Sequence, residues 1–145
     1  ISKEFRFEAA HAILNYDGAC KNIHGHTYHL TVTLIGAPEP MKQDVKLGMV
    51  IDFGDVKECI QRIILSRFDH ALVLNEEAPY SRSAIISSEF EKVILVPYQP
   101  TCENLLLDFV ELVKPSFNGA ARLVAMRLEE TPSSWAEWQE ADNEK

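Results

Sequence analysis

The sequence predicts an α+β fold in which two helices pack on one face of a mainly antiparallel sheet. Several short segments alternate between apolar and polar side chains, or are rich in β-branched and aromatic residues, as strands are. Two other segments repeat apolar residues at intervals of three and four, which is typical of amphipathic helices. The 145 residues show no internal repeat and no long linker, so we expect a single domain over residues 1–145.

Two strands are predicted near the N-terminus. Residues 3–10 alternate, with Phe5 and Phe7 facing one way and Arg6 the other. Residues 26–35 read His-Thr-Tyr-His-Leu-Thr-Val-Thr-Leu-Ile, and these β-branched and aromatic side chains favour a strand. Because the two segments follow one another along the chain, we expect them to be neighbours in the sheet, as in a hairpin.

A loop and a short strand are predicted before the first helix. Residues 36–46 contain two prolines and predict the loop, and residues 48–53 predict the short strand. Asp52 can cap the helix that follows, and Asp55 lies in its first turn. One apolar stripe of this helix is expected to face the core, namely Val56, Cys59, Ile60, Ile63 and Ile64.

The second half of the chain predicts two further strands and a second helix. Residues 76–90 are polar and irregular, which indicates a loop, and residues 92–96 predict a buried strand. Thr101 is the expected cap of the second helix, which Pro115 ends. Residues 121–130 predict the last strand, followed by a polar tail. The apolar stripe of the second helix is Leu105, Leu106, Phe109, Leu112 and Val113.

Composition and charge exclude several classes of function. The formal net charge is −8, whereas nucleic acids and anionic membranes select a basic face, so we expect neither as a partner. No apolar run approaches the roughly 20 residues that cross a bilayer, and the first residues lack the apolar block of a signal peptide. The three cysteines are widely spaced without a C-x-x-C pair, which argues against a disulfide framework. We therefore expect a cytoplasmic protein.

Three histidines form the strongest candidate site. His24 and His26 are two apart on a predicted strand, so their imidazoles project to the same side, and the intervening glycine permits a bend. His11 ends the neighbouring strand and is the best third ligand, whereas His29 points to the other face. Imidazole suits zinc, and three protein ligands with one open position are typical of catalytic zinc. The alternative is a set of histidines without a metal.

Cys20 lies four residues before His24, in the turn that leads to the predicted metal site. A thiol close to a dication can have a depressed pKa and act as a nucleophile or base. The alternative is that Cys20 is a fourth, structural ligand, which would close the site and leave no room for a substrate.

Two further groups of polar residues could take part in chemistry. Asp69 and His70 follow the first helix, and the carboxylate could fix the imidazole tautomer in a polar relay, although such a pair is also common in loops. Glu129 and Glu130 end the last strand, so one should face inward, where it could hold an amidine-like ring edge. The alternative is that both carboxylates are solvated.

Six short motifs occur together in an order and spacing that resemble the 6-pyruvoyltetrahydropterin synthase / 6-carboxytetrahydropterin synthase family. The resemblance runs from about Phe5 to Trp138, and the ending Glu130-Thr131-Pro132-x-Ser134-Trp135-Ala136-Glu137 looks more like the bacterial 6-carboxytetrahydropterin synthases of queuosine biosynthesis. The motifs are Phe7-x-Ala9-Ala10-His11, Cys20-x-x-x-His24-Gly25-His26, Asp52-Phe53, Asp69-His70, Pro100-Thr101-x-Glu103-Asn104 and Glu130-Thr131.

The resemblance implies roles for the matched residues and a more detailed fold. It implies that Cys20 is the catalytic thiol, with Asp69 and His70 as a proton relay. Glu130 would anchor the pterin ring, assisted by the segment Thr101–Glu103. The zinc ligands would be His11, His24 and His26. The fold implied is the tunnelling fold, a four-stranded antiparallel sheet with two helices on one face, assembled as trimers or hexamers with active sites between subunits.

The resemblance also implies a reaction. The substrate would be 7,8-dihydroneopterin triphosphate, and the products 6-carboxy-5,6,7,8-tetrahydropterin, acetaldehyde and triphosphate. A 6-pyruvoyltetrahydropterin synthase, a dihydroneopterin-type aldolase, a structural zinc module and a pterin-binding protein without activity are the alternatives. Cations for the triphosphate are not assigned among Lys21, Arg82 and others, and residues 76–91 and 38–46 form longer loops than the family minimum, so specificity could differ.

Overall fold

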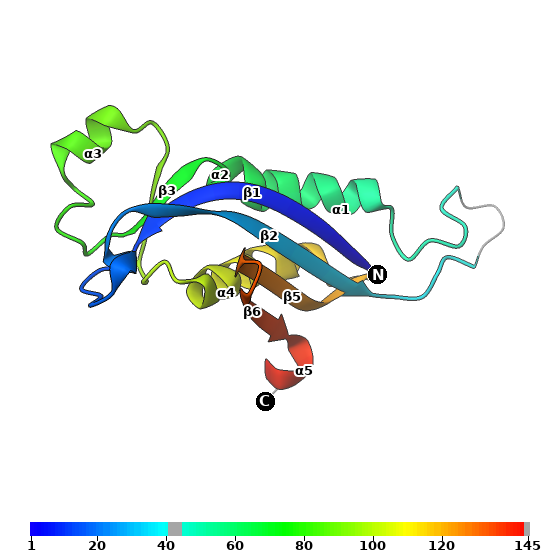
Figure 1. The fold of residues 1–145 in the computed structure, drawn as a ribbon. Coiled ribbons are helices and arrows are strands. Elements are labelled where there is room, and N and C mark those ends of the chain that lie inside the picture. The colour runs from blue at the N-terminus through cyan, green and yellow to red at the C-terminus, as the bar shows by residue number, and fades with distance from the viewer. Residues whose placement is uncertain (41–44, 144–145) are drawn as a thin grey trace.

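A long antiparallel pair of strands forms the centre of the molecule. The computed structural model describes residues 1–40 and 45–143. In it, β1 (Ser2–Ala12) pairs with β2 (His24–Ile35) over ten residue pairs, from Ser2 opposite Thr33 to His11 opposite His24. Figure 1 shows the two strands crossing the whole sheet side by side. The hairpin predicted from the alternating and β-branched segments is therefore confirmed.

The sheet has six strands in the order β4-β3-β1-β2-β5-β6. On one side of the central pair, β5 (Arg122–Thr131) and β6 (Ser134–Gln139) continue the antiparallel pattern. On the other side, β3 (Ala71–Asn75) pairs parallel with β1, and β4 (Val93–Val96) pairs parallel with β3. The expected four-stranded antiparallel sheet is thus present as β1, β2, β5 and β6, and the mixed sheet extends beyond it by two parallel strands.

The helices pack on one face of this sheet. A continuous helix consists of α1 (Phe53–Ile60), a π-helical turn (Gln61–Leu65) and α2 (Ser66–Phe68), and α4 (Cys102–Val113) lies beside it. Both predicted caps are confirmed, because Asp52 accepts a hydrogen bond from Gly54 and Thr101 accepts one from Asn104. No helix of the described residues is long and apolar enough to span a membrane.

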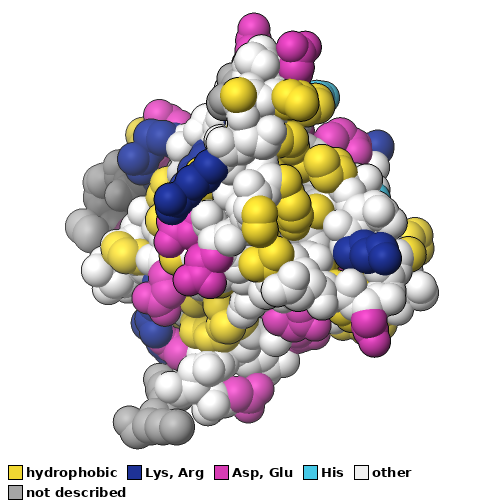
Figure 2. Space-filling model, turned by 90° about the vertical axis from the view of Figure 1, so that its left-hand side faces the viewer, with side chains coloured by type: hydrophobic (Ala, Val, Ile, Leu, Met, Phe, Trp, Pro, Cys, Tyr) yellow, Lys and Arg dark blue, Asp and Glu magenta, His cyan; other side chains and the backbone are white. Residues whose placement is uncertain are grey.

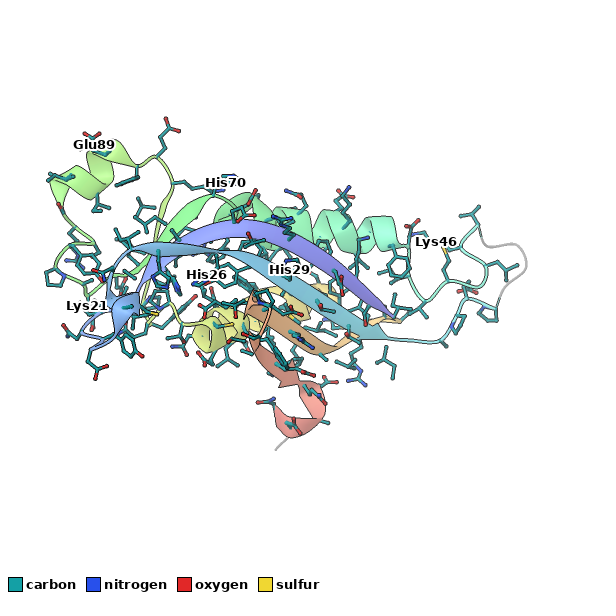
Figure 3. All side chains as sticks on the ribbon, in the orientation of Figure 1. Lys21, His26, His29, Lys46, His70 and Glu89 are labelled. Carbon is teal, nitrogen blue, oxygen red and sulfur yellow. The ribbon has the colours of Figure 1, made fainter. Side chains whose placement is uncertain are left out.

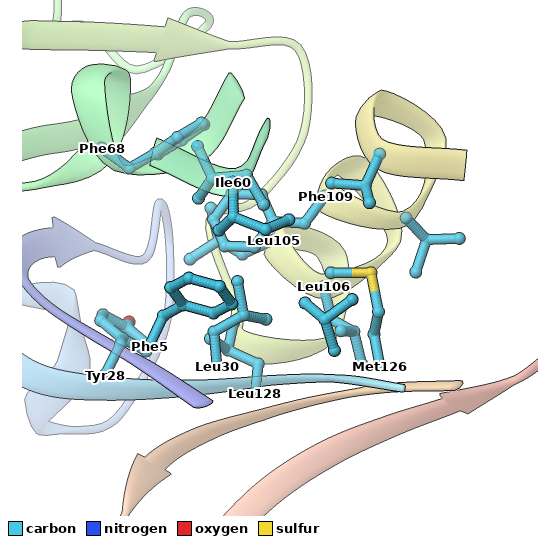
Figure 4. Close-up of a cluster of buried hydrophobic side chains, with 14 of the residues drawn as sticks. Phe5, Tyr28, Leu30, Ile60, Phe68, Leu105, Leu106, Phe109, Met126 and Leu128 are labelled. Carbon is cyan, nitrogen blue, oxygen red and sulfur yellow. The ribbon is translucent and has the colours of Figure 1, made fainter. Parts of the chain in front are cut away.

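The core lies between the helices and the sheet face that they cover (Figure 4). The predicted stripes supply much of it, since Ile60 and Phe109 are fully buried. The rings of Phe7 and Tyr28 stack at 5.2 Å between centroids, and Phe109 meets the rings of Phe7 and Phe68 edge-on. These aromatic contacts join β1 and β2 to both helices, so the sheet and the helices form one core.

Three sequence-based expectations were wrong or incomplete. Residues 48–53 do not form a strand, because Gly48 adopts a φ of +81° and the apolar residues after it bend onto the core before α1 begins. The expected loop 76–90 contains α3 (Ala84–Glu89). The polar tail contains β6 and α5 (Glu140–Asn143). The expected loop 36–46 is confirmed where it is described, and its residues 41–44 lie outside the described residues.

Candidate metal centre and active site

The three predicted ligands converge at one end of the covered sheet face. Odd residues of β1 and even residues of β2 face the helices, and His11 lies directly opposite His24 in the ladder. The Nε2 atoms of His11 and His24 are 3.1 Å apart. One nitrogen from each of His11, His24 and His26 lies within 4.8 Å of the other two. The spacing argument therefore identified a real cluster, and His29 lies outside it, exposed on β2 (Figure 3).

Two backbone carbonyls fix the orientation of these imidazoles. His11 Nδ1 donates to the carbonyl of Pro100 at 2.5 Å, and His24 Nδ1 donates to the carbonyl of Asn22 at 2.8 Å. A carbonyl can only accept, so each Nδ1 carries the proton and each Nε2 presents a lone pair. Two facing lone pairs at 3.1 Å repel one another unless a cation lies between them.

The surroundings of the cluster also favour a metal. His11 is only 3% exposed, and burial lowers the pKa of both His11 and His26 below the ordinary value of 6.5. Both imidazoles are therefore neutral near pH 7, which is the form that binds metals. Nε2 of His26 is buried without a hydrogen-bond partner in the described residues. A tetrahedral zinc holds nitrogen ligands at about 2.0–2.1 Å and thus roughly 3.3 Å apart, which is close to the 3.1 Å between the Nε2 atoms of His11 and His24.

Glu130 reaches the cluster from β5. Its Oε1 lies 3.5 Å from Nε2 of His11 and 3.6 Å from Nε2 of His26, and it accepts a 3.4 Å hydrogen bond from the hydroxyl of Tyr28. Burial and the Glu130 carboxylate raise the pKa of Tyr28, which stays a neutral donor. Glu129 points elsewhere and pairs with Arg127 at 3.1 Å. Of the two carboxylates, Glu130 is therefore the one that faces the candidate site.

A bulge in β5 gives Glu130 this position. The β2:β5 ladder ends at the pair His29 and Glu129, and the β5:β6 register shifts between Glu129 and Thr131. Bulges of this kind commonly redirect a side chain next to an active site. A cavity of about 470 Å³ opens where the ladder ends, with His26 and Glu130 among its lining residues. The carboxylate is thus accessible to a small molecule that enters beside the histidines.

Cys20 lies near this end of the molecule but does not belong to the cluster. It is exposed in a short 3-10 turn (Ala19–Lys21), and its carbonyl accepts a hydrogen bond from the amide of Ile13 at 2.9 Å. Among the described residues, the group of mutually close metal donors contains the three histidines and no sulfur. This geometry favours the open arrangement over a closed site with Cys20 as a fourth ligand.

Asp69 and His70 lie on the other side of β1 from the histidines. Their Oδ1 and Nδ1 atoms are 3.0 Å apart, and Asp69 Oδ1 also accepts the amide of Glu8 at 3.0 Å. His70 adopts a φ of +58°, and its amide donates to the Glu8 carbonyl at 2.6 Å. The exposed imidazole borders a cavity of about 840 Å³ between β1, β2 and the segment Glu89–Lys92. His26 also lines this cavity, as well as the smaller one beside Glu130, so within one chain the larger cavity borders both His70 and one member of the histidine cluster.

The end of the molecule that carries these groups exposes apolar side chains. Figure 2 views this end and shows hydrophobic atoms gathered between acidic and basic groups. The turn before β2 exposes Tyr16 and Ile23, and the segment around α3 exposes Ile85 and Phe90. Contiguous apolar patches on a protein surface commonly mark contact with another protein, whereas single exposed apolar side chains are ordinary.

Thr101 and Glu103 lie at the N-terminus of α4. The Thr101 hydroxyl caps the helix, and Glu103 is exposed in its first turn. The preceding residue, Pro100, supplies the carbonyl that orients His11, and Cys102 Sγ donates to the Leu128 carbonyl at 3.2 Å. This segment therefore packs against the candidate site, and a direct role for Thr101 or Glu103 in binding stays a prediction.

Sequence reasoning missed Tyr28 and the two orienting carbonyls. Tyr28 continues the alternation that links His24 and His26, so extending the same two-residue period would have placed its hydroxyl on the metal side. The carbonyls of Pro100 and Asn22 carry no side-chain signal. Their positions depend on how α4 and the turn before β2 pack, which no local pattern records.

Comparison with known proteins identifies the family of the chain. The family model described as 6-pyruvoyl tetrahydropterin synthase matches residues 1–141. The 6-carboxy-5,6,7,8-tetrahydropterin synthase of Haemophilus influenzae is 35% identical over 142 residues, which cover 97% of this chain and 98% of that protein. The 6-carboxy-5,6,7,8-tetrahydropterin synthase of Aquifex aeolicus is 32% identical, with 97% of each chain covered.

Solved structures show the same fold. An uncharacterized protein from Wolinella succinogenes superposes with a TM-score of 0.80 at 20% identity, covering 97% of each chain. The 6-pyruvoyl tetrahydropterin synthase of Caenorhabditis elegans superposes with a TM-score of 0.66 at 23% identity, covering 96% of this chain and 93% of that one. The α+β arrangement is therefore the tunnelling fold that the motifs implied. By the family model and by these relatives, the chain belongs to the 6-pyruvoyl tetrahydropterin synthase family.

Proposed function

We propose that the protein is a zinc-dependent lyase that converts 7,8-dihydroneopterin triphosphate and water to 6-carboxy-5,6,7,8-tetrahydropterin, acetaldehyde and triphosphate. The reaction would serve queuosine and other 7-deazaguanine biosynthesis in the cytoplasm. The choice of this product rests on relatives that carry the name 6-carboxy-5,6,7,8-tetrahydropterin synthase over nearly their whole length. The observation that carries the proposal is the convergence of one nitrogen from each of three histidines beside the Glu130 carboxylate and a cavity.

His11, His24 and His26 would hold the zinc through Nε2. When bound, zinc would supply Lewis acidity that lowers the pKa of the substrate's side-chain hydroxyls. The carbonyls of Pro100 and Asn22 keep two of the imidazoles in the tautomer that leaves Nε2 free. These contacts hold the ligands in position before any metal or substrate arrives.

Glu130 would bind the pterin ring. A carboxylate can accept two parallel hydrogen bonds from the amino group and the adjacent ring N–H of a pterin. Tyr28 donates to the same carboxylate, and the cavity at the end of the β2:β5 ladder gives a ring access to it. Because Glu130 also lies beside His11 and His26, a ring bound there would present its side chain to the metal ligands.

Cys20 would move a proton at the carbon next to the coordinated hydroxyls, with Asp69 and His70 as its relay. We propose that neighbouring subunits of a trimer or hexamer complete each site, with Cys20 from one subunit and His70 from the next. The apolar side chains exposed by the Cys20 turn and by α3 support such a contact. Hydrogen bonds from Glu8 and His70 to the Asp69 carboxylate hold the relay in one geometry.

Product analysis tests the proposal. Zinc-loaded protein is incubated with 7,8-dihydroneopterin triphosphate, and acetaldehyde and the pterin product are identified. We expect acetaldehyde and 6-carboxytetrahydropterin in equal amounts. Triphosphate release without acetaldehyde would instead identify a 6-pyruvoyltetrahydropterin synthase, and binding without any product would identify a pterin-binding protein.

Cys20→Ala separates the enzyme from a structural zinc module. We expect this variant to retain zinc and the fold and to lose turnover, because Cys20 lies outside the group of metal donors. Loss of zinc together with loss of the fold would show that the thiol is a structural ligand.

A further inference from the structure

We propose that Gln99 is a positioning residue that holds the Cys20-bearing turn in a fixed relation to the metal ligands. The inference rests on the proposed function, because it concerns the thiol that this function requires. Gln99 lies between β4 and α4, 85 positions along the chain from Leu14, and neither residue belongs to a motif described above. Its side chain nevertheless joins the two segments that frame the site.

The Gln99 amide binds both backbone groups of one residue. Its Oε1 accepts the amide of Leu14 at 3.0 Å, and its Nε2 donates to the carbonyl of Leu14 at 2.6 Å. A side-chain amide thus replaces a strand partner for the first residues after β1. We call this pair of hydrogen bonds the Gln99–Leu14 clamp. Both hydrogen bonds are partly buried, so breaking them costs free energy that hydrogen bonds to water do not fully restore.

The clamp acts on the turn that carries Cys20. Ile13, next to Leu14, donates its amide to the carbonyl of Cys20 at 2.9 Å. In the described part of the chain, the other hydrogen bonds of residues 13–22 are made within that segment or with His24. The clamp therefore connects an otherwise locally bonded turn to the rest of the fold.

The other end of the clamp is anchored at the metal ligands. The Gln99 carbonyl accepts from the amide of Thr101 at 2.7 Å and from Asn104 Nδ2 at 3.0 Å, which fixes it to the capped end of α4. The next residue, Pro100, orients His11. Two consecutive residues thus hold the two parts of the site. The Pro100 carbonyl orients His11, and the Gln99 side chain holds the turn that carries Cys20.

Gln99→Met tests this role, because methionine has nearly the same length and volume but lacks both hydrogen-bonding groups. We expect zinc content and KM to stay at the wild-type values, while kcat falls by about 10-fold, since two hydrogen bonds are lost. Amide exchange of residues 14–22 should accelerate by a similar factor in the zinc-loaded protein. Gln99→Glu, which keeps the acceptor but not the donor, is the second variant and should also lower kcat at full zinc content.

Gln139→Ala is the matched control, because the Gln139 amide bonds to Glu137 on an exposed strand. It should leave exchange, zinc content and kcat unchanged. If amide exchange in residues 14–22 of Gln99→Met stays at the wild-type rate, the proposal is overturned. Loss of zinc from both Gln99 variants would also overturn it, because Gln99 would then support the metal site alone. If wild-type protein shows no turnover, the proposed function fails, and the exchange measurement still decides whether the clamp holds the turn.

Discussion

At the scale of single residues, backbone carbonyls decide which atom each imidazole offers. Pro100 and Asn22 take the Nδ1 protons of two histidines, so the Nε2 lone pairs are directed at a common point before a metal binds. Burial of His11 then favours the neutral ring. The ligands therefore lose little conformational freedom on metal binding, which favours a high affinity.

The first prediction concerns His11 and uses His29 as its control. His11→Ala should weaken zinc binding by more than about 100-fold, because even the loss of an outer-shell partner commonly costs about 10–100-fold. His29→Ala removes an exposed imidazole from the same sheet and should retain one zinc per chain. Metal content after dialysis against a chelator measures both. Equal zinc in the two variants would contradict the assignment of His11 as a ligand.

The second prediction concerns the buried thiol of Cys102. Burial raises the pKa of Cys102 to about 11, because it disfavours the thiolate. Since the thiolate is the reactive form, iodoacetamide should leave Cys102 unmodified in folded protein at pH 8, and modification should increase only as the pH approaches 11. Peptide mass spectrometry measures this, with urea-unfolded protein as the control. Equal rates of modification at pH 8 in folded and unfolded protein would contradict the prediction.

At the scale of elements, the sequence predicted those segments whose two sides differ. β1 and β2 alternate because one face meets the helices, and α1 and α4 show a stripe for the same reason. Every residue of β3 is buried, so its sequence lacks any alternation that would distinguish a strand. β6 is an edge strand with one buried side chain, Trp138, and its polar composition resembles a tail.

In the candidate site, too, some residues could be predicted from the sequence and others could not. Its three histidines could be predicted because two lie at strand spacing and the third ends the neighbouring strand. Glu130 could be assigned to the site only by family resemblance, because its orientation depends on a bulge that no sequence pattern predicts. The contacts with Pro100 and Gln99 depend on the packing of α4, which joins segments more than 80 residues apart.

The third prediction concerns the start of α4. Thr101→Ala removes the side-chain cap and should lower the free energy of unfolding by about 1 kcal/mol. Thr101→Ser keeps a hydroxyl that can accept from Asn104 and should restore most of this loss. Urea unfolding followed by circular dichroism measures both variants. If Thr101→Ser were as unstable as Thr101→Ala, the threonine methyl group and not the cap would account for the loss.

At the scale of the whole molecule, the sheet has one covered and one uncovered face. The histidine cluster lies on the covered face, and His70 borders the larger of the two cavities, which His26 also lines. Both lie at the same end of the molecule, where apolar side chains are exposed (Figure 2). An oligomer that joins these ends can bring the two groups together without any rearrangement within a chain.

The fourth prediction tests this arrangement by complementation. Cys20→Ala and His70→Ala should each be inactive alone, because each lacks one part of the proposed relay. When the two variants are co-expressed and assemble at random, about one quarter of the sites combine an intact Cys20 with an intact His70 from a neighbour, so about a quarter of wild-type activity should return. Turnover of the co-purified oligomer measures this. Mixed oligomers without activity would show that both residues act within the same chain.

The position of all three metal ligands within residues 11–26 also has a consequence for the order of folding. These ligands belong to one hairpin and can meet as soon as β1 and β2 pair, whereas Glu130 joins only after β5 has added to the sheet. We expect zinc to bind a partly folded chain and to accelerate refolding by stabilising this early hairpin. Stopped-flow refolding with and without zinc tests this expectation, and identical folding rates with slower unfolding would place metal binding after the rate-limiting step.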